Sequence, residues 1–281
     1  MTTPTPDATG TRPDEILVED LHKSFDAHPV LRGINLRVAR GELVAIVGGS
    51  GSGKTVLLQH LIAHLQPDSG RVLVADHETA GSPLRDLATL SESELDRIRR
   101  HWAVVFQRNA LLSGTVLENL SLWLREIHAL TDEQIRPRAR RVLEQVGLEP
   151  ERTLALDRSA LSGGMAKRVA IARALILEPV LIFYDEPTSG LDPHFASTVH
   201  ELIAETHARA AALPDGSTAP LTSLIITHDT ALLRRLRPRV VMLRDGAVGF
   251  DGSYEAFESS RDPQILPYFE QMPMLNRRVV A

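Results

Sequence analysis

A glycine-rich stretch carries the clearest chemistry in this sequence, and it reads Gly-Gly-Ser-Gly-Ser-Gly-Lys-Thr over Gly48–Thr55. It matches the pattern G-x-x-x-x-G-K-[ST]. Glycines let a backbone curl so that its N–H groups point at phosphate oxygens, and a helix N-terminus adds partial positive charge there. Lys54 is placed to reach β- and γ-phosphates, and the Thr55 hydroxyl is placed to hold Mg²⁺. The residues expected around the phosphates are Gly48, Gly49, Ser50, Gly51, Ser52, Gly53, Lys54 and Thr55.

The elements on either side of this stretch give the pattern its mechanical meaning. The apolar run Leu43–Val47 indicates a buried strand, and Val56–Ile62 indicates the opening of a helix. A flexible Gly/Ser-rich linker can match the pattern by chance, but a linker does not join a strand to a helix with lysine at the required place. We therefore expect this stretch to bind a nucleotide.

Two consecutive acidic residues supply what such a phosphate loop needs next. The apolar run Val180–Tyr184 is typical of a parallel strand covered on both faces, and it ends at Asp185 and Glu186. An acidic residue at the tip of a neighbouring parallel strand can hold Mg²⁺, and Glu186 can accept a proton from water attacking the γ-phosphate. A surface turn is the better interpretation of such a pair in isolation. With a phosphate loop upstream, a catalytic role is favoured.

A second anion-binding pattern occurs at Leu161–Met165, where Ser162, Gly163 and Gly164 open a helix. Ser162 can cap that helix, and the two glycines leave backbone N–H groups open. An ordinary capped helix explains the serine but not two successive glycines at its start. One chain thus carries two phosphate-binding stretches. A simple resolution is that each serves a different end of a shared nucleotide, with two subunits facing each other.

Composition narrows the classes of function. The chain has 281 residues, of which 43% are hydrophobic, so it can bury a substantial core. Its 31 basic and 36 acidic residues give a net charge of −5, which argues against dedicated nucleic-acid binding. The absence of cysteine excludes disulfides and thiolate zinc sites. No uninterrupted apolar stretch is long enough to cross a bilayer, so any action at a membrane requires docking onto another chain.

The order of patterns along the chain predicts an α/β fold. Short alternating runs at Ile16–Phe25, Gly33–Val38 and Arg71–Asp76 predict an antiparallel β layer beside the phosphate loop. Helical patterns dominate residues 115–175, and the α/β pattern resumes after Pro179, including a helix expected over His194–Leu213. The predicted fold class is a P-loop NTPase core with a mostly parallel sheet, an antiparallel β layer and an inserted helical subdomain.

These patterns also predict the domain organisation. Residues 1–14 are rich in Thr, Pro and Asp and are expected to be a disordered tail. Residues 15–250 form the predicted ATPase domain, with its helical subdomain at about 108–178. Residues 251–281 form a C-terminal extension that can either cap the core or reach a partner.

Taken together, these motifs resemble the ATP-binding cassette (ABC) family over about Ile16–Phe250, with every element in family order. Besides the phosphate loop, the matching positions are a Q-loop glutamine at Gln107, the signature Leu161–Met165, the Walker B strand Leu181–Asp185 with Glu186 after it, a D-loop at Ser189–Asp192, and a switch histidine at His228. Phe25 falls where the family places an aromatic that stacks on adenine. From the residues alone, a core or surface aromatic is an equally good interpretation of Phe25.

The resemblance implies an ATP hydrolase that works as a head-to-tail homodimer, with two ATP molecules sandwiched between phosphate loop and signature. It implies that Thr55, Asp185 and Gln107 organise Mg²⁺, that Glu186 polarises the attacking water, and that His228 contacts the γ-phosphate. Ser162, Gly163 and Gly164 would close the site from the opposite chain, and Asp192 would join the two sites across the interface.

The resemblance further favours the motor subunit of a membrane transporter. No long coiled coil separates Lys54 from Leu161, unlike in chromosome-maintenance cassettes, and ribosome-associated cassette proteins usually carry two cassettes. A non-transport ABC ATPase is an alternative. The transporter role implies a separate integral membrane permease and a peripheral location on the cytoplasmic face of the inner membrane. Apolar residues that could receive that permease are Leu111, Leu112, Leu117, Leu122 and Trp123; the alternative is that most of them belong to the core of the helical subdomain.

The cargo is predicted from finer features. The signature has Met165 where glutamine is usual, and Leu161–Ala174 resembles the LSGGM-x-[KR]-R-x-A-x-A-R-A pattern of phospholipid-trafficking (Mla-type, mammalian-cell-entry) cassettes. Phe106–Leu112, which includes Asn109, also resembles that group. This implies lipid transport, with a membrane-anchored lipid-binding partner of the mammalian-cell-entry type. The alternative is the ATPase subunit of a polar amino-acid importer.

Overall fold

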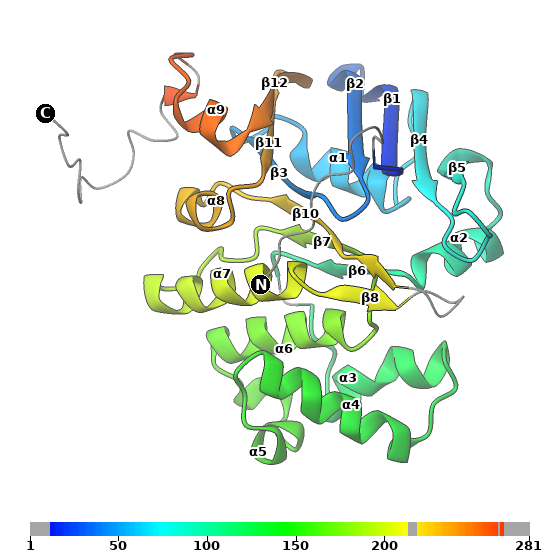
Figure 1. The fold of residues 1–281 in the computed structure, drawn as a ribbon, viewed down its shortest axis with the longest axis vertical. Coiled ribbons are helices and arrows are strands. Elements are labelled where there is room, and N and C mark those ends of the chain that lie inside the picture. The colour runs from blue at the N-terminus through cyan, green and yellow to red at the C-terminus, as the bar shows by residue number, and fades with distance from the viewer. Residues whose placement is uncertain (1–11, 109, 213–217, 264, 267–281) are drawn as a thin grey trace, which may run out of the picture.

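A computed structural model describes residues 12–108, 110–212, 218–263 and 265–266. Figure 1 shows antiparallel strands at the top, a central sheet below them, and a group of helices under that sheet. The strands are β1 (Asp14–Phe25), β2 (His28–Ala39), β3 (Leu43–Gly48), β4 (Ser69–Ala75), β5 (Leu84–Asp86), β6 (Trp102–Val105), β7 (Leu181–Asp185), β8 (Ala210–Ala212), β9 (Thr218–Pro220), β10 (Thr222–Ile226), β11 (Arg239–Arg244) and β12 (Ala247–Ser253). The α-helices are α1 (Lys54–Leu61), α2 (Glu92–Arg99), α3 (Val116–Glu126), α4 (Asp132–Gln145), α5 (Pro150–Leu154), α6 (Gly163–Leu175), α7 (Pro193–His207), α8 (Thr230–Leu236) and α9 (Tyr254–Glu258), with 3₁₀ turns at Leu87–Thr89 and Arg158–Ala160.

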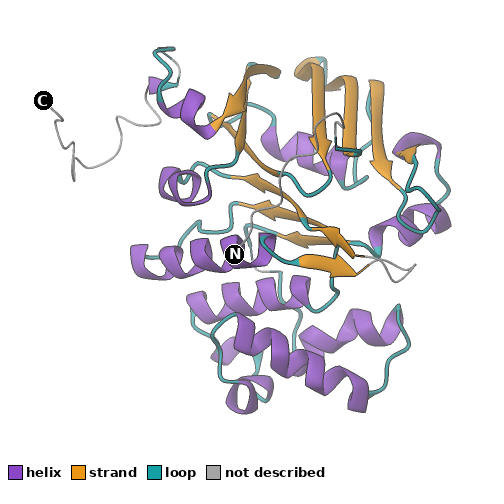
Figure 2. Ribbon diagram, in the orientation of Figure 1, coloured by secondary structure: helices purple, strands orange, loops and turns teal. Residues whose placement is uncertain are grey.

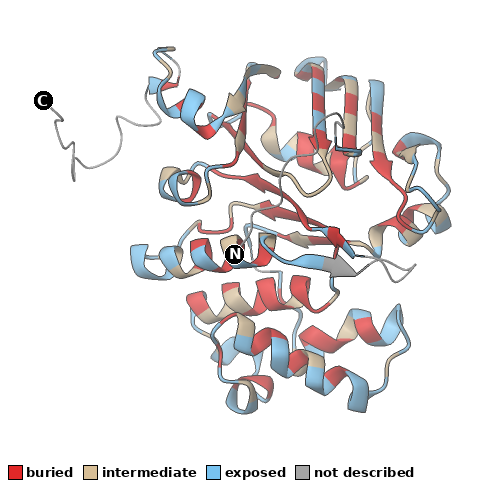
Figure 3. Cartoon of the chain, viewed as in Figure 1, coloured by how far each residue is buried: buried red, intermediate tan, exposed pale blue. Residues whose placement is uncertain are grey.

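The central sheet has the strand order β12-β11-β3-β10-β7-β6, and every neighbouring pair is parallel except β11 with β12. Both of its faces are buried, as a mostly parallel sheet requires (Figure 3). On β7, for example, Leu181 and Phe183 pack on one face, while Ile182 and Tyr184 pack on the other. The predicted fold class is therefore confirmed.

The two faces of this sheet carry different layers. Helix α1 shares a core with the four-stranded sheet β2-β1-β4-β5, through Leu57, Leu58 and Leu61. On the opposite face, α3, α4, α6 and α7 share a core with β7 and β10. Figure 2 shows this uneven distribution, with most helices gathered on one side of the sheet. The hydrophobic core of the predicted helical subdomain is thus continuous with the central sheet.

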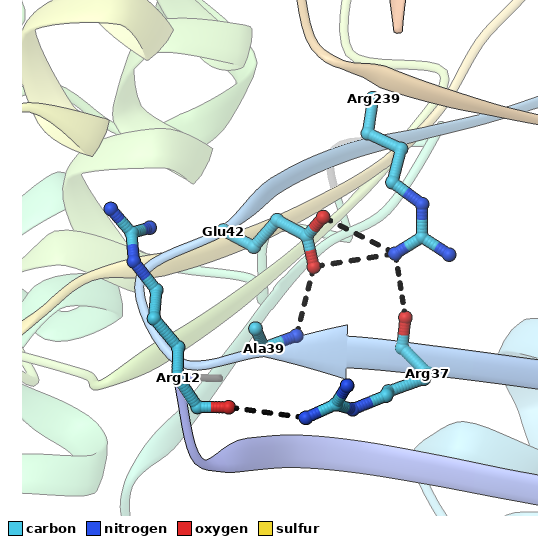
Figure 4. Close-up of a pocket in the computed structure, with 5 residues that line it drawn as sticks. All are labelled: Arg12, Arg37, Ala39, Glu42 and Arg239. Atoms are coloured by element: carbon cyan, nitrogen blue, oxygen red, sulfur yellow. Dashed lines mark hydrogen bonds and ion pairs between the residues drawn. The ribbon is translucent and has the colours of Figure 1, made fainter. Parts of the chain in front are cut away.

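A network of arginines fastens the antiparallel sheet to the central one. Arg239 on β11 donates to the backbone oxygen of Arg37 on β2 at 2.7 Å and to Glu42 Oε1 at 3.2 Å. These side chains, with Arg12 and Ala39, line a hollow of about 270 Å³ (Figure 4). Because Arg239 and Arg37 already form hydrogen bonds within the chain, we interpret this hollow as part of the contact between the two sheets and not as a ligand site.

Helix ends follow local sequence signals in the helical block. The Thr131 N–H donates to the Gln134 side chain at 3.0 Å, as the capping pattern predicts for the start of α4. Gly147, with φ +69°, follows the end of α4 in the left-handed region that favours glycine. Pro137 lies inside α4, where it removes one backbone hydrogen-bond donor.

The helix expected over His194–Leu213 is shorter in the structure, because α7 ends at His207. Ala210–Ala212 instead pairs antiparallel with Thr218–Pro220. Alanine favours helix strongly, but antiparallel pairing with Thr218–Pro220 overrides that local preference, and Leu213 lies outside the described residues.

Described residues near both ends of the chain belong to the core clusters. Strand β1 begins at Asp14, the last residue of the predicted tail, and residues 1–11 lie outside the described part. In the C-terminal extension, Tyr254 and Phe257 of α9 are buried against β11 in one cluster that includes Ile265. Residues 267–281 lie outside the described part, as does Asn109. The described section of the extension therefore caps the core.

Candidate functional site

The glycine-rich loop joins β3 to α1 as the sequence predicts, and its first and last glycines have tight surroundings. Gly48 has φ +152°, and a Cβ there would lie 2.5 Å from both the Leu243 oxygen and Ser52 Oγ. Gly53 has φ +99°, and a Cβ there would lie 2.7 Å from Leu31 Cδ2. Only glycine fits these two positions, because any larger side chain meets both strain and a clash.

The middle of the loop fits a phosphate group. Ideal Cβ atoms at Gly49 and Gly51 would meet nothing within 4 Å, so the loop is open on that side. Helix α1 begins without a side-chain cap, which leaves its first N–H groups for an anion. Ser52 Oγ is buried, and within the described residues it has no hydrogen-bond partner. Each of these features suits the binding of phosphate oxygens.

Lys54 lies over this loop. Its Nζ donates to the backbone oxygens of Gly48 at 2.7 Å and Gly49 at 2.9 Å. Burial lowers the pKa of Lys54, while the nearby carboxylates of Glu186 and Asp185 act in the opposite direction. The lysine is therefore held at the loop, close enough to the acidic pair at the end of β7 for their charges to act on it.

The acidic pair lies at the carboxyl end of β7. Asp185 pairs with Ile226 of β10, and the Glu186 N–H donates to the Ile226 oxygen at 2.9 Å. Burial, followed by the negative charge of Glu186, raises the pKa of Asp185, while Lys167 and Lys54 act to lower it. Glu186 has φ +47°, a left-handed conformation that costs on the order of 1–2 kcal/mol for a residue with a Cβ. Such strain is typical of functional positions.

His228 follows β10 and faces Glu186. Its Nδ1 lies 2.8 Å from Glu186 Oε2, although the pair lacks the alignment of a hydrogen bond. The His228 side chain is 68% exposed, whereas that of Glu186 is 13% exposed. The histidine can therefore reach a ligand from solvent while the carboxylate beneath it is sheltered.

Sequence reasoning missed Asp229, the residue after His228, which bonds to three segments around the site. It accepts hydrogen bonds from Thr188 Oγ1 at 2.7 Å and His200 Nε2 at 2.8 Å, and from the first-turn N–H groups of α8. Burial alone would raise the pKa of Asp229, but the hydrogen bonds from His200, Thr188 and the Leu232 N–H outweigh it and lower that pKa. An aspartate just before a helix is a capping signal, and that signal was available in the sequence.

Gln107 follows β6, and its Nε2 donates to Ser189 Oγ at 3.3 Å. Its backbone oxygen accepts from Lys167 Nζ at 3.0 Å. Lys167 is only 2% exposed, and burial lowers its pKa while Asp185 and Glu186 oppose that change. Sequence reasoning assigned Lys167 no role, because Arg168 and Arg173 on the same helix make it one of several cations there.

The signature stretch has a different environment. Ser162 Oγ caps α6 by accepting from the Met165 N–H at 3.3 Å. A Cβ on Gly163 would meet nothing within 4 Å, whereas a Cβ on Gly164 would lie 3.2 Å from the Phe195 ring. Among the described contacts, none joins Ser162, Gly163 or Gly164 to the phosphate loop. These three residues are therefore not brought together with that loop within one chain.

Asp192 and Phe25 are positioned by α7 and β1, respectively. Asp192 caps α7, and its carboxylate accepts from the N–H groups of His194 at 3.1 Å and Phe195 at 3.2 Å. Phe25, at the end of β1, is 43% exposed, and its ring centroid lies 5.7 Å from Lys23 Nζ. The exposure of Phe25 excludes a core role, and it leaves the ring available for stacking.

One edge of the central sheet gathers the phosphate loop, the acidic pair and two further predicted side chains. The phosphate loop, His228, the acidic pair and Gln107 follow β3, β10, β7 and β6, which are consecutive parallel strands in the sheet. Ligands bind at this carboxyl edge in open α/β sheets. Within the described residues, no group of three or more His, Asp or Glu side chains could hold a metal alone. Mg²⁺ held by one carboxylate plus nucleotide phosphates needs no such group.

Comparisons with known proteins agree with this geometry. The model of the ABC transporter family matches residues 31–189. The histidine transport ATP-binding protein HisP of Pseudomonas aeruginosa is 36% identical over 241 residues, covering 84% of this chain and 89% of that protein. Other matched relatives are named for the import of L-cystine, phosphonates and methionine. The protein TRIGALACTOSYLDIACYLGLYCEROL 3 of Arabidopsis thaliana is 33% identical over 260 residues, covering 89% of this chain and 72% of that protein.

A solved structure extends the comparison to the fold. A dimeric ATP-binding cassette in a post-hydrolysis state, bound to ADP and Pi, aligns with a TM-score of 0.70 and 30% identity. The alignment covers 85% of this chain and 98% of that one. In the described part of the present chain, no helix is both long and apolar enough to cross a membrane.

Proposed function

This chain belongs to the ABC transporter family as an ATP-hydrolysing motor subunit, and we propose that its phosphate loop, acidic pair and His228 form the catalytic half of an ATP site. The observation that carries the proposal is their position after consecutive strands at one sheet edge, with Lys54 over the loop and His228 Nδ1 2.8 Å from Glu186. Mg²⁺ bound with ATP would supply charge neutralisation of the phosphates.

The chain's own residues divide the work at this site. Lys54 and the loop N–H groups bind the phosphates, and Thr55, Asp185 and Gln107 hold the metal. Glu186 accepts the proton of the attacking water, because its carboxylate is sheltered and its Oε2, although close to His228, accepts no hydrogen bond among the described contacts. His228 lies beside it to contact the γ-phosphate. Phe25, being exposed, stacks on the adenine.

The other half of the site comes from a second copy of the chain. Ser162, Gly163 and Gly164 make no described contact with the phosphate loop of their own chain, and Gly163 faces open space. A head-to-tail homodimer would place this open helix start against the phosphates bound by the partner, and Asp192 would lie at the interface. A relative that is a dimeric cassette supports this arrangement.

Glu186→Gln tests the catalytic assignment. The change keeps the size of the side chain but removes its basicity, so we expect steady-state ATP hydrolysis to fall by about 10²-fold or more. We also expect an ATP-dependent dimer to accumulate, measured by size-exclusion chromatography with light scattering.

Glu201→Gln is the matched control, because Glu201 is an exposed residue of α7 that pairs with Arg235 of α8. That variant should hydrolyse ATP at the parent rate. A Glu186→Gln protein with parent activity would remove Glu186 from the role of base.

For the cargo, we propose that the chain energises import of a small polar solute such as an amino acid. Relatives named for histidine, L-cystine and methionine transport support this alternative better than lipid traffic. Lipid transport remains a second candidate for two reasons. The signature has Met165, and one relative carries a galactolipid name.

The chains that copurify with this subunit decide between the two cargos. In either case we propose that it docks on the cytoplasmic face of the inner membrane through a separate permease. Leu112 and Trp123, which are 50% and 47% exposed, offer apolar contact area for that permease, whereas Leu111 is buried. The experiment is affinity purification from mild-detergent membranes followed by mass spectrometry. A soluble solute-binding protein supports amino-acid import, and a membrane-anchored lipid-binding protein overturns it in favour of lipid.

A further inference from the structure

Several backbone oxygens between β6 and α3 accept hydrogen bonds from lysine and arginine side chains of the helical block. Lys167 Nζ donates to the backbone oxygens of Phe106 at 3.4 Å and Gln107 at 3.0 Å. Further along the segment, Arg173 Nη1 donates to the Ala110 oxygen at 2.8 Å, and Arg158 Nη1 donates to the Leu111 oxygen at 2.6 Å. These backbone oxygens, which lie outside the helices and strands, thus receive charged donors, which make stronger hydrogen bonds than neutral ones.

Lys167 is the most deeply buried of these donors. It is 2% exposed, whereas its neighbours on α6 include Val169, Ala170, Ile171 and Ala172, all buried in the apolar core. Burying an ammonium group is costly unless it is hydrogen-bonded, and an apolar residue at this place would avoid the cost. The lysine bonds both oxygens that flank the Gln107 peptide, so its position constrains that peptide directly.

We propose that Lys167 is a positioning residue for ATP hydrolysis, because it fixes the Gln107 backbone to α6 and thereby aims the Gln107 side chain at the metal and water of the site. This inference rests on the proposed function. Gln107 has a side-chain contact with Ser189 at 3.3 Å, but its backbone is held in place by Lys167.

The same bond has a consequence for the partner's site. Ser162 caps the start of α6, five residues before Lys167, which is about 7.5 Å along a helix. In the proposed dimer, Ser162 faces the nucleotide of the other chain, while Lys167 holds Gln107 in its own site. A shift of α6 at one site would therefore move Gln107 at the other, and Lys167 is the link between them.

Lys167→Met tests this link, since methionine keeps the length of the side chain and removes the donor. We expect kcat for ATP hydrolysis to fall by about 10- to 100-fold, as for outer-shell supports of metal sites, with KM for ATP unchanged. We also expect the Mg²⁺ concentration for half-maximal activity to rise. As a readout besides activity, Mg²⁺ should raise the melting temperature of the ATP-bound variant less than that of the parent.

Arg99→Met is the matched control. Arg99 also donates to two successive backbone oxygens, those of Ile62 at 3.4 Å and Ala63 at 2.9 Å, but these follow the far end of α1. If Lys167→Met has the same kcat and the same Mg²⁺ dependence as the parent protein, the inference is wrong. An equal loss of kcat in both variants would also overturn it, because the loss would then reflect general destabilisation.

A second variant and the turnover of the parent protein distinguish failure of the positioning role from failure of the proposed function. Should Lys167→Met fail to fold, Arg173→Met loosens the same segment at Ala110 from a half-buried position and must show the same split between kcat and KM. Parent protein without ATP turnover would refute the proposed function itself. Normal parent turnover with an unaffected Lys167→Met protein refutes only the positioning role.

Discussion

Two glycine-rich helix starts in this molecule look alike in sequence but differ in construction. The start of α1 lacks a side-chain cap and has Lys54 folded over its own loop. The start of α6 is capped by its own Ser162, and Gly163 faces open space. The start of α1 lies at the same edge of the central sheet as the acidic pair and His228. Helix α6 belongs to the group of helices that covers the other face of this sheet, opposite α1 (Figure 1).

This difference teaches that folding completes only one half of the site. The α1 half, which comprises the phosphate loop, Asp185, Glu186 and His228, is assembled by contacts within one chain. The α6 half, which comprises Ser162, Gly163 and Gly164, is preformed but faces outward. Changes in the α1 half should therefore affect folding and catalysis together, whereas changes at the outward face of the α6 half should affect catalysis alone.

The largest expected effect comes from mixing two inactive variants. Lys54→Met disables the α1 half, and Gly163→Arg blocks the α6 half at a position where an added Cβ meets nothing within 4 Å. Each variant alone should lose about 10²-fold or more of the ATP hydrolysis rate. In an equimolar mixture, random pairing should restore about a quarter of parent activity, because half the dimers carry one intact composite site. The measurement is phosphate release after exchange of subunits.

Lys54→Met mixed with Glu186→Gln is the control, because both changes lie in the α1 half and no intact site can form. That mixture should stay inactive. If the first mixture also stays inactive while each variant folds and pairs, both halves serve the same chain and the comparison above is wrong.

A smaller effect, on stability, is expected from Asp229→Ala. The change removes the cap of α8 and the hydrogen bonds from Thr188 and His200, so we expect a loss of about 2–4 kcal/mol at neutral pH. Because folding lowers the pKa of Asp229, its contribution is complete above the unfolded-state pKa of about 4 and is lost as pH falls further. Urea unfolding at pH 7 and pH 3 should show the variant and the parent converging in acid.

Asp192→Ala is the matched control, because it removes a helix cap of the same kind. Asp192 also caps a helix through two N–H groups, but among its described contacts there is no side-chain partner. Its loss should cost only about 1 kcal/mol. Equal losses in the two variants would show that the bonds of Asp229 to Thr188 and His200 add nothing to the α1 half.

The smallest effect separates two adjacent glycines. A Cβ on Gly163 meets nothing within 4 Å, but one on Gly164 lies 3.2 Å from the Phe195 ring. We therefore expect the free energy of unfolding of Gly164→Ala to be about 1 kcal/mol lower than that of Gly163→Ala. Thermal melts of the nucleotide-free proteins provide the measurement. A less stable Gly163→Ala protein would indicate that this face is already covered within the chain.

Local patterns in the sequence were enough to locate the phosphate loop, the acidic pair and most strands. Gly48–Thr55 was recognised from its spacing and from the strand and helix patterns beside it, and the apolar run before Asp185 predicts a strand buried on both faces, which the structure confirms. These features succeed because they depend on neighbours within a few residues. The same reasoning failed at Ala210–Ala212, where pairing with Thr218–Pro220 decides the conformation.

The tertiary structure alone decided how distant residues combine. Lys167 bonds the Gln107 backbone 60 positions away, and Thr188 bonds Asp229 41 positions away, so no local spacing could have joined them. It also decided that the two glycine-rich helix starts belong to helices on opposite faces of one sheet. Sequence periodicity specifies which face of an element is buried, but the packing of whole elements determines which side chains meet across the fold.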